Sequence, residues 1–271
     1  LVRMPAFPHH AFTDHESARA GPAAPVRVLA STGSAVADDD NIIVATAERI
    51  FADLADAQTV IHTPDGSWKA PLWEALPGAG LPLSGGPESC DGSGASLADG
   101  FAVLSAAGRA ALAAPLAETM LAGWLLAQAG MAAPPGAMTI APARPKDRIA
   151  LNDDGTLSGI PRGVPFASEA KHIAVVATGA AGIAIALVEA SACRIAAGLS
   201  IANDASDTVT FDKARPLTIK PAPAGFDATT LLLMGGVARS LQIAGALEAM
   251  LEISVGYANE RIAFEKKIAK F

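Results

Sequence analysis

The sequence has little cysteine, few aromatic side chains and few charges. Its 271 residues include 2 cysteines and 1 tyrosine, only 5% of the positions are aromatic, and 17% are charged. The two cysteines, Cys90 and Cys193, exclude a disulfide framework and have no metal-ligand spacing. We therefore expect two reduced thiols, no metal site and a cytoplasmic protein.

An excess of basic residues is also missing. The formal net charge is −7 and the sequence pI is near 5.2. No cluster of lysine and arginine offsets this acidic balance, which argues against a surface that binds nucleic acid.

Mean hydropathy is +0.35, high enough to make a membrane span worth testing. The apolar run from Ile173 to Leu187 falls short of the roughly 20 residues that a span needs. It is interrupted at Thr178 and Gly179, so it predicts two buried strands around a turn, and no membrane span is expected. Residues 1–37 lack the basic and apolar segments of a secretory signal and predict a flexible leader.

The next part of the chain predicts helices. Apolar residues recur at spacings of three and four from Ile43 to about residue 57, after acidic residues that suit a helix start. Further helices are expected over 72–76, 97–108 and 115–130. The breaker segment 131–136 ends this α-helical N-terminal domain, which we assign to 38–131.

Short β-branched runs separated by turn residues then predict a small central β domain over 137–221. Asn152 to Gly155 indicates a hairpin turn. The strands are expected on its two sides, over 148–151 and 156–160, and over 173–177, 183–188, 208–211 and 217–220.

A second boundary, rich in proline and alanine, follows at 221–225. The segment 226–271 begins with a predicted helix over about 229–260, about 45–50 Å long. Helices, then a β domain, then one long helix indicate an α+β multidomain protein, without the βαβ alternation of a Rossmann fold.

The segment 257–271, Tyr-Ala-Asn-Glu-Arg-Ile-Ala-Phe-Glu-Lys-Lys-Ile-Ala-Lys-Phe, resembles a motif of the acyl-CoA dehydrogenase family. There the first long helix of the C-terminal domain ends in Tyr-Ala…Arg-x-x-Phe-Gly-x-x-Ile-x-x-Phe, and residues 242–252 match the same helix. Pro87 to Leu97 is similar to the family's Pro-Glu-x-x-Gly-Gly-x-Gly-x-Ser/Thr loop. Two segments that are also common in the family, Ala107–Arg109 and Pro115–Thr119, follow it in the sequence. Gly163 to Lys171 resembles a Val-Pro-aromatic-Ala segment of shorter members.

The resemblance implies a helical N-terminal domain, a central β domain and a C-terminal helical bundle. Residues 226–271 would supply the bundle's first long helix, with the rest of the bundle absent from this sequence. It also implies FAD between the β domain and the bundle, and α,β-dehydrogenation of an acyl-CoA thioester in fatty acid or lipid metabolism. The implied partners are an electron-transfer flavoprotein or similar acceptor and a homo- or hetero-oligomer, either a dimer or a tetramer.

Two flavin-binding stretches of the family are changed in this sequence. Residues 138–147 keep little beyond Thr139 of the family's Leu-Thr-Glu-Pro-x-x-Gly-Ser-Asp stretch. Residues 165–168 replace its Trp-Ile-Thr/Ser-Asn flavin wall. The resemblance implies that Phe166 stacks on the isoalloxazine and that Ser168 donates a hydrogen bond. The alternative is that the two residues have ordinary roles in the core and a turn of the β domain.

The catalytic base is unknown. In most members it is a Glu that would lie beyond Phe271, and in some it precedes the motif arginine by 26 residues, where this sequence has Gly235 followed by Gly236. Glu248 and Glu252 lie on the long helix, where a solvated polar stripe is the simpler role.

Arg261 and Phe264 match the family motif most directly. By resemblance, Arg261 reaches the pyrophosphate of FAD bound by a neighbouring subunit, since a guanidinium fork suits phosphate oxygens. Phe264 would pack near the adenine. The alternative for Arg261 is a cation at a helix C-terminus. Glu265 stands where the family has glycine, and puts a negative charge close to the expected phosphate.

Three functions remain open. The first is an FAD-dependent acyl-CoA dehydrogenase-like enzyme, and the second is a non-catalytic subunit of that fold that contributes structure or half a site to a partner. Flavin-dependent monooxygenases that share the fold are the third. For all three, the long helix is apolar around most of its circumference, so we expect other helices to cover it.

Overall fold

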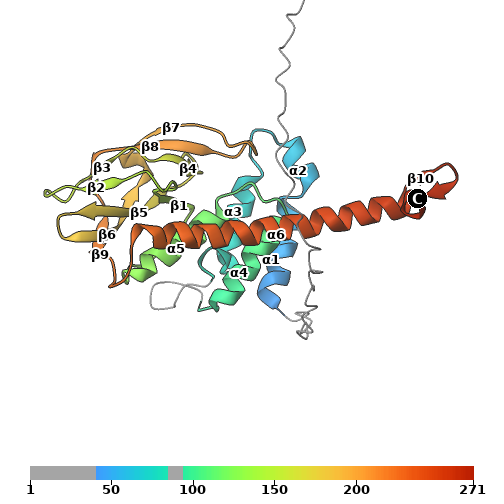
Figure 1. Ribbon diagram of the computed structural model, residues 1–271, viewed down its shortest axis with the longest axis horizontal. Coiled ribbons are helices and arrows are strands. Elements are labelled where there is room, and N and C mark those ends of the chain that lie inside the picture. Colours follow the sequence, from blue (N-terminus) through green and yellow to red (C-terminus); the bar gives the residue numbers. More distant parts are fainter. Residues whose placement is uncertain (1–40, 85–93) are drawn as a thin grey trace, which may run out of the picture. The chain divides into compact units, whose positions relative to one another are not determined.

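Short helices with side-chain caps form the first part of the computed structural model, which describes residues 41–84 and 94–271 (Figure 1). The Asn41 side chain accepts hydrogen bonds from the first backbone N–H groups of α1, and Asp56 caps α2 in the same way. Ser96 and Asp99 form a capping box at the start of α4. The helical elements are α1 (Ile42–Leu54), α2 (Ala57–His62), α3 (Lys69–Gly78), η1 (Leu81–Leu83), α4 (Leu97–Arg109) and α5 (Leu116–Gln128).

These helices lie where the sequence predicts them, with α2 and η1 as additions. The leader expected over 1–37 and the Pro87–Ser93 part of the family loop lie outside the described residues. The first helix has its N-cap at Asn41, the last residue of the predicted start 38–41, and residues 38–40 lie outside the described residues.

A mixed β-sheet occupies the middle of the chain. Its strand order is β4-β8-β3-β2-β5-β6-β9, with β1 paired to β5 and β7 paired to β8. The β5–β6 hairpin pairs antiparallel along its whole length, while β1 and β2 run parallel to β5. The strands are β1 (Met138–Ala141), β2 (Ile149–Leu151), β3 (Leu157–Gly159), β4 (Arg162–Pro165), β5 (His172–Gly179), β6 (Gly182–Glu189), β7 (Arg194–Ala196), β8 (Ser206–Ala214) and β9 (Thr218–Pro221), with η3 (Ala190–Ala192) after β6.

The predicted strands and the hairpin turn after β2 are present, and β1, β4 and β7 are additional. These three strands are three or four residues long. All four residues of β1 are buried, so the alternation by which a strand is usually identified is missing there.

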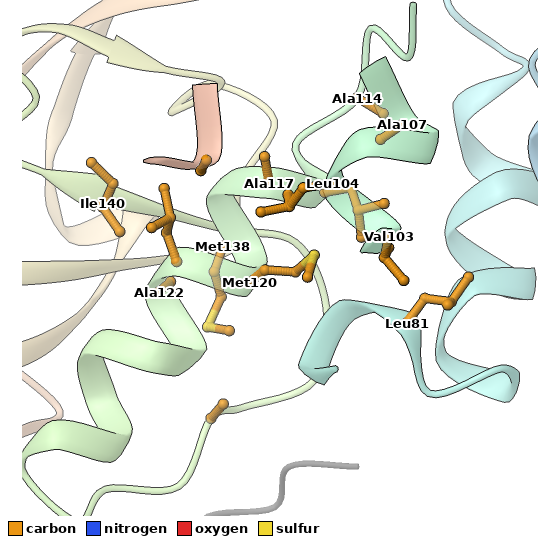
Figure 2. Packing of buried hydrophobic residues seen from close by; sticks show 14 of the residues in the cluster. Leu81, Val103, Leu104, Ala107, Ala114, Ala117, Met120, Ala122, Met138 and Ile140 are labelled. Carbon is orange, nitrogen blue, oxygen red and sulfur yellow. The ribbon is translucent and has the colours of Figure 1, made fainter. Parts of the chain in front are cut away.

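Strand β5 separates two hydrophobic cores. Ala174 and Val176 face the helices, whereas Ile173 and Val175 face the rest of the sheet, because successive side chains of a strand point to opposite faces. Figure 2 shows the helical core, in which Met138 of β1 packs among side chains of α4 and α5. The sheet is thus attached to the helices through one apolar face.

The long helix α6 (Ala228–Glu260) has 33 residues and begins with a capping box between Asp227 and Thr230. It packs along α4 and extends to a small C-terminal hairpin, β10 (Ile262–Ala263) with β11 (Lys266–Lys267), which is followed by η4 (Ile268–Lys270) (Figure 1). The helix was predicted within one residue at its start. The hairpin was not predicted, since two-residue strands carry no periodic pattern.

Glycines permit a very close approach of α4 and α6. A Cβ atom on Gly108 would lie 2.0 Å from the backbone oxygen of Gln242, and one on Gly245 would lie 2.1 Å from the backbone oxygen of Ser105. Both distances are far shorter than any van der Waals contact. No side chain larger than hydrogen fits at either position with the helices at this separation.

Large apolar side chains stay exposed along the outer side of α6. They are between 42% and 71% exposed: Leu233, Val237, Ile243, Leu247, Met250, Leu251, Ile253 and Val255. By length and composition α6 could also cross a membrane, with a mean hydropathy of 1.4 in its most apolar window. The expectation of no membrane span came from the apolar run that forms β5 and β6, and not from this helix. Helix α6 contacts α4 and α5, and 17% of that window is buried against the described part of the chain.

Replacing Gly108 or Gly245 by alanine should destabilise the protein by about 1–3 kcal/mol or more, because the helices must separate or bend. Gly256→Ala is the matched control in the same helix, since its added Cβ meets nothing within 4 Å. We expect the control to gain about 0.4–1 kcal/mol from the lower entropy of the unfolded chain. Chemical denaturation measures all three variants, and equal effects would contradict the close contact.

The exposed face of α6 should be covered by other helices in solution. Burial of each large side chain is worth about 1.5–3 kcal/mol, so the purified chain should not be a monodisperse monomer in light scattering at micromolar concentration. Leu247→Glu with Ile253→Glu should shift the distribution towards smaller particles. Ile160→Glu, at a 56% exposed position in the β part, should leave it unchanged.

Candidate functional site

A carboxylate is buried where α5 meets α6. Glu118 lies in the first turn of α5 and is 1% exposed. Its Oε1 accepts a hydrogen bond from Nη2 of Arg239 on α6, and no described residue donates to its Oε2. Burial raises the pKa of the Glu118 carboxyl above its ordinary value, and the guanidinium of Arg239 opposes that rise.

The Arg239 side chain is 49% exposed and holds a second contact, from Nη1 to Oε1 of Gln242 at 2.6 Å. Arg239 therefore has one side in the protein and one side towards solvent. Gly235 lies one turn earlier on the same face of α6, since residues four apart on a helix are neighbours.

Three more charges gather beside this pair. Nζ of Lys69, from α3, donates to both carboxylate oxygens of Glu169 at 2.8 Å. Asp204, in the loop between β7 and β8, interacts electrostatically with Lys69, Arg239 and Glu169. Burial raises the pKa of Asp204, and the two cations oppose the rise. We call these five residues (Lys69, Glu118, Glu169, Asp204 and Arg239) the junction cluster, because they come from α3, α5, α6 and two loops of the β part.

The junction cluster has one more acid than base, so it is better suited to a proton or a hydrogen-bond donor than to an anion. The sequence did not predict this cluster. Glu118 is the one charged residue of α5, and Arg239 is the one charged residue between 228 and 247. A single charge on each of two apolar helices, with opposite signs, could have predicted that Glu118 and Arg239 form an ion pair.

The predicted residues Phe166 and Ser168 lie next to the junction cluster. The Lys69 ammonium is 5.6 Å from the centroid of the Phe166 ring, which is only 5% exposed. The turn is fixed by Asp207, whose Oδ2 accepts from the Ser168 N–H at 2.7 Å. Ser168 itself is exposed, so its side chain is accessible from outside. Stacking of Phe166 on a ligand requires the covering side chains, Lys69 among them, to move.

Arg261 and Phe264 lie at the other end of α6. Arg261 follows the last helical residue, 22 residues and about 33 Å of helix beyond Arg239. Phe264 is 91% exposed and makes an edge contact with Phe271, with centroids 6.5 Å apart. One chain therefore does not bring this pair together with Phe166 and Ser168.

The two other glutamates of α6 are held by α4. Glu252 accepts from both terminal nitrogens of Arg109, the shorter contact being 2.7 Å, and Glu248 lies 3.7 Å from the same guanidinium. The Arg109 partner lowers the pKa of Glu252. Both carboxylates are largely exposed, in keeping with the solvated stripe that the sequence indicated.

No protein-family model matches the chain, and neither does any curated protein. Solved structures do match. A glycine-to-alanine variant of the Tcur3481-Tcur3483 steroid ACAD (acyl-CoA dehydrogenase) has a TM-score of 0.69 and 25% identity, over 84% of this chain and 69% of that one. The ChsE4-ChsE5 complex from Mycobacterium tuberculosis gives 0.70 and 22% over the same shares.

PigA with FAD and proline gives a TM-score of 0.66 at 18% identity, over 84% of this chain and 70% of that one. These likenesses agree with the order of helices, mixed sheet and long helix described above. They confirm the similarity that the motifs predicted. The chain is structurally similar to the acyl-CoA dehydrogenase family over 84% of its length and has the fold of that family's N-terminal and β domains.

Proposed function

We propose that this chain is an acyl-CoA dehydrogenase-like flavoprotein that acts on an acyl-CoA thioester. The observation that carries the proposal is the meeting of helices, β part and α6 at the junction cluster, in a fold shared with acyl-CoA dehydrogenases. Glu118 is the buried charge of the cluster, and a buried charge is expensive to keep in a protein core. Its position where α5 meets α6, beside the partly exposed charges of the other elements, supports a site for chemistry over a purely stabilising role.

The exposed polar residues fit FAD at two places. Ser168 presents a side chain beside the junction cluster that suits the polar edge of a flavin, and Arg261 presents an exposed guanidinium that suits a pyrophosphate. Phe166 and Phe264 would contribute ring contacts. When bound, FAD would supply the acceptor for the hydride, as flavins do. The distance between the two places supports a cofactor held across an interface between subunits.

The second candidate is a non-catalytic subunit that contributes structure or half a site to a partner. Two observations favour it: no side chain stands at Gly235, and one of the similar structures is the ChsE4-ChsE5 complex. A flavin absorption spectrum of the purified chain separates the candidates. A colourless protein that stays colourless after reconstitution with FAD favours the second.

We further propose a cytoplasmic homo- or hetero-oligomer that passes electrons to an electron-transfer flavoprotein or a similar acceptor. The exposed apolar face of α6 supports the oligomer. An acceptor is needed because a reduced flavin must be reoxidised before a second turnover.

Arg261→Ala should weaken FAD binding, because it removes a charge-assisted hydrogen bond to phosphate worth about 1.5–3 kcal/mol. That corresponds to a loss of about 10- to 150-fold in affinity. Lys266→Ala is the matched control, since it removes an exposed cation of the same hairpin. Fluorescence titration of the apoprotein with FAD measures both, and unchanged affinity in the Arg261 variant would count against an interfacial cofactor.

Glu265→Gly tests the same end of α6 in the opposite direction. Glu265 has a φ of 60° in the hairpin turn, a left-handed conformation that glycine adopts without strain. The variant also removes a negative charge four residues from Arg261. We expect tighter FAD binding in the same titration, and weaker binding would exclude a phosphate at this turn.

A further inference from the structure

The loop between β1 and β2 carries an excess of positive charge. Arg144, Lys146 and Arg148 alternate with other residues along it, and all three are exposed. The fold adds Arg162, exposed at the start of β4, because its N–H donates to Oδ2 of Asp147 at 2.7 Å. Asp147 is the one acid of this loop. We call Arg144, Lys146, Arg148 and Arg162 the basic loop patch. The sequence did not predict it, since Arg162 joins the loop only through the fold.

Hydrogen bonds within the loop hold these cations in position. Nη1 of Arg148 donates to the backbone oxygens of Pro145 and Asp147, at 2.6 and 2.8 Å. The Asp147 N–H donates to the backbone oxygen of Arg144 at 3.2 Å. The carboxylate of Asp147 is used to attach the loop to β4, so the loop's acid accepts from backbone and not from a cationic side chain.

The Arg144 guanidinium lies against β4. Its Nε and Nη2 atoms would lie 2.8 Å from a Cβ atom added to Gly163, so the absence of a side chain at Gly163 is what admits the guanidinium there. Neither Arg144 nor its neighbour Arg162 has a side-chain hydrogen bond or ion pair among the described residues. A guanidinium without a counter-ion, beside a second one, favours an anion, and its planar fork matches phosphate oxygens.

Strand β4 connects the basic loop patch with the predicted flavin contacts. Phe166 follows the last residue of β4 directly, and the exposed Ser168 comes two residues later. Gly163, against which Arg144 lies, is at most about 11 Å from Phe166 along the chain. A ligand that reacts near Phe166 would therefore bring a distant part of itself to the patch if it extends along β4.

We propose that the basic loop patch binds the phosphates at the nucleotide end of coenzyme A, with Arg144 in direct contact with a phosphate. This inference rests on the proposed function, which takes an acyl-CoA thioester as the substrate. Coenzyme A carries a 3′-phosphate and a diphosphate, and the uncharged pantetheine arm separates them from the thioester. The arm would span the distance between the flavin contacts and the patch. The other basic segment, at 261–270, is separate and contains Arg261, which is proposed for the FAD pyrophosphate.

The test is calorimetric titration of the purified chain with CoA, 3′-dephospho-CoA and pantetheine, with and without FAD, and it requires no turnover. We expect CoA to bind most tightly and pantetheine, which has no phosphate, most weakly. Arg144→Gln combined with Arg162→Gln should weaken CoA binding at least about 10-fold, because charge-assisted hydrogen bonds to phosphate are lost. The advantage of CoA over pantetheine should fall by the same factor.

Lys213→Gln combined with Arg215→Gln is the matched control, because it removes the same charge from two exposed positions of the β part. Arg162 pairs with Thr208 of β8, and Ala214, between the control positions, lies about 20 Å further along that strand. At that separation salt screens the interaction, so the control should bind CoA within about twofold of the parent. Equal losses in the two double variants would indicate a general charge effect and overturn the inference.

Arg144→Lys separates the guanidinium fork from its charge. Lysine keeps the charge without the fork, so this variant should bind CoA with an affinity between those of the parent and the Arg144→Gln variant. The thermal unfolding midpoint should stay at the parent value in every variant, because the replaced side chains are exposed. Parent affinity for CoA in Arg144→Gln would overturn the role of Arg144.

The remaining outcomes distinguish the ligand and the two levels of the proposal. A parent chain that binds CoA no better than pantetheine overturns the inference. The same holds if the double variant loses affinity for FAD, or for an acidic acyl-carrier protein, while it keeps its affinity for CoA. A chain that binds no FAD overturns the proposed function, whereas the CoA titration without FAD still decides the inference.

Discussion

The contact of α4 with α6 at Gly108 and Gly245 is the constraint on which the rest of the arrangement depends. Backbone lies against backbone there, so the two helices have one possible separation. That separation brings Glu252 to Arg109 on one side of α6. Further along the same helix it brings Arg239 to Glu118 of α5. Interiors pack closely and do not deform continuously, so a shift at the glycines would move both ion pairs.

The two ion pairs differ in what they contribute to the stability of the folded protein. The Arg109–Glu252 pair is largely exposed, and such pairs contribute little to stability. The Glu118–Arg239 pair removes a carboxylate from water and leaves one of its oxygens without a hydrogen-bond partner among the described residues. A group of that kind is tolerated only where the surrounding packing holds it. Here the packing around α5 comes from the helical core, which includes side chains of β1 and β5, and from the long helix α6.

The expected cofactor contacts are divided between the two ends of α6. Ser168 is held beside the junction cluster by Asp207, whereas Arg261 and Phe264 extend from a hairpin at the far end. The exposed apolar side chains lie on the helix between them. A second copy that covers this surface would also bring its own hairpin to a neighbouring chain, so cofactor binding and assembly would depend on the same interface.

The sequence by itself determined the order of elements, the strands of the central hairpins and the long helix, because hydrophobic periodicity and caps such as Ser96 act locally. It also determined the family likeness through Arg261, Phe264 and the motifs before them. Short strands such as β1, which lack alternation, were decided by pairing with β5. The junction cluster was decided by tertiary structure alone. Glu118 and Arg239 are 121 residues apart and meet because two glycines let α6 lie against α4. No local sequence pattern encodes a contact between residues so far apart in the chain.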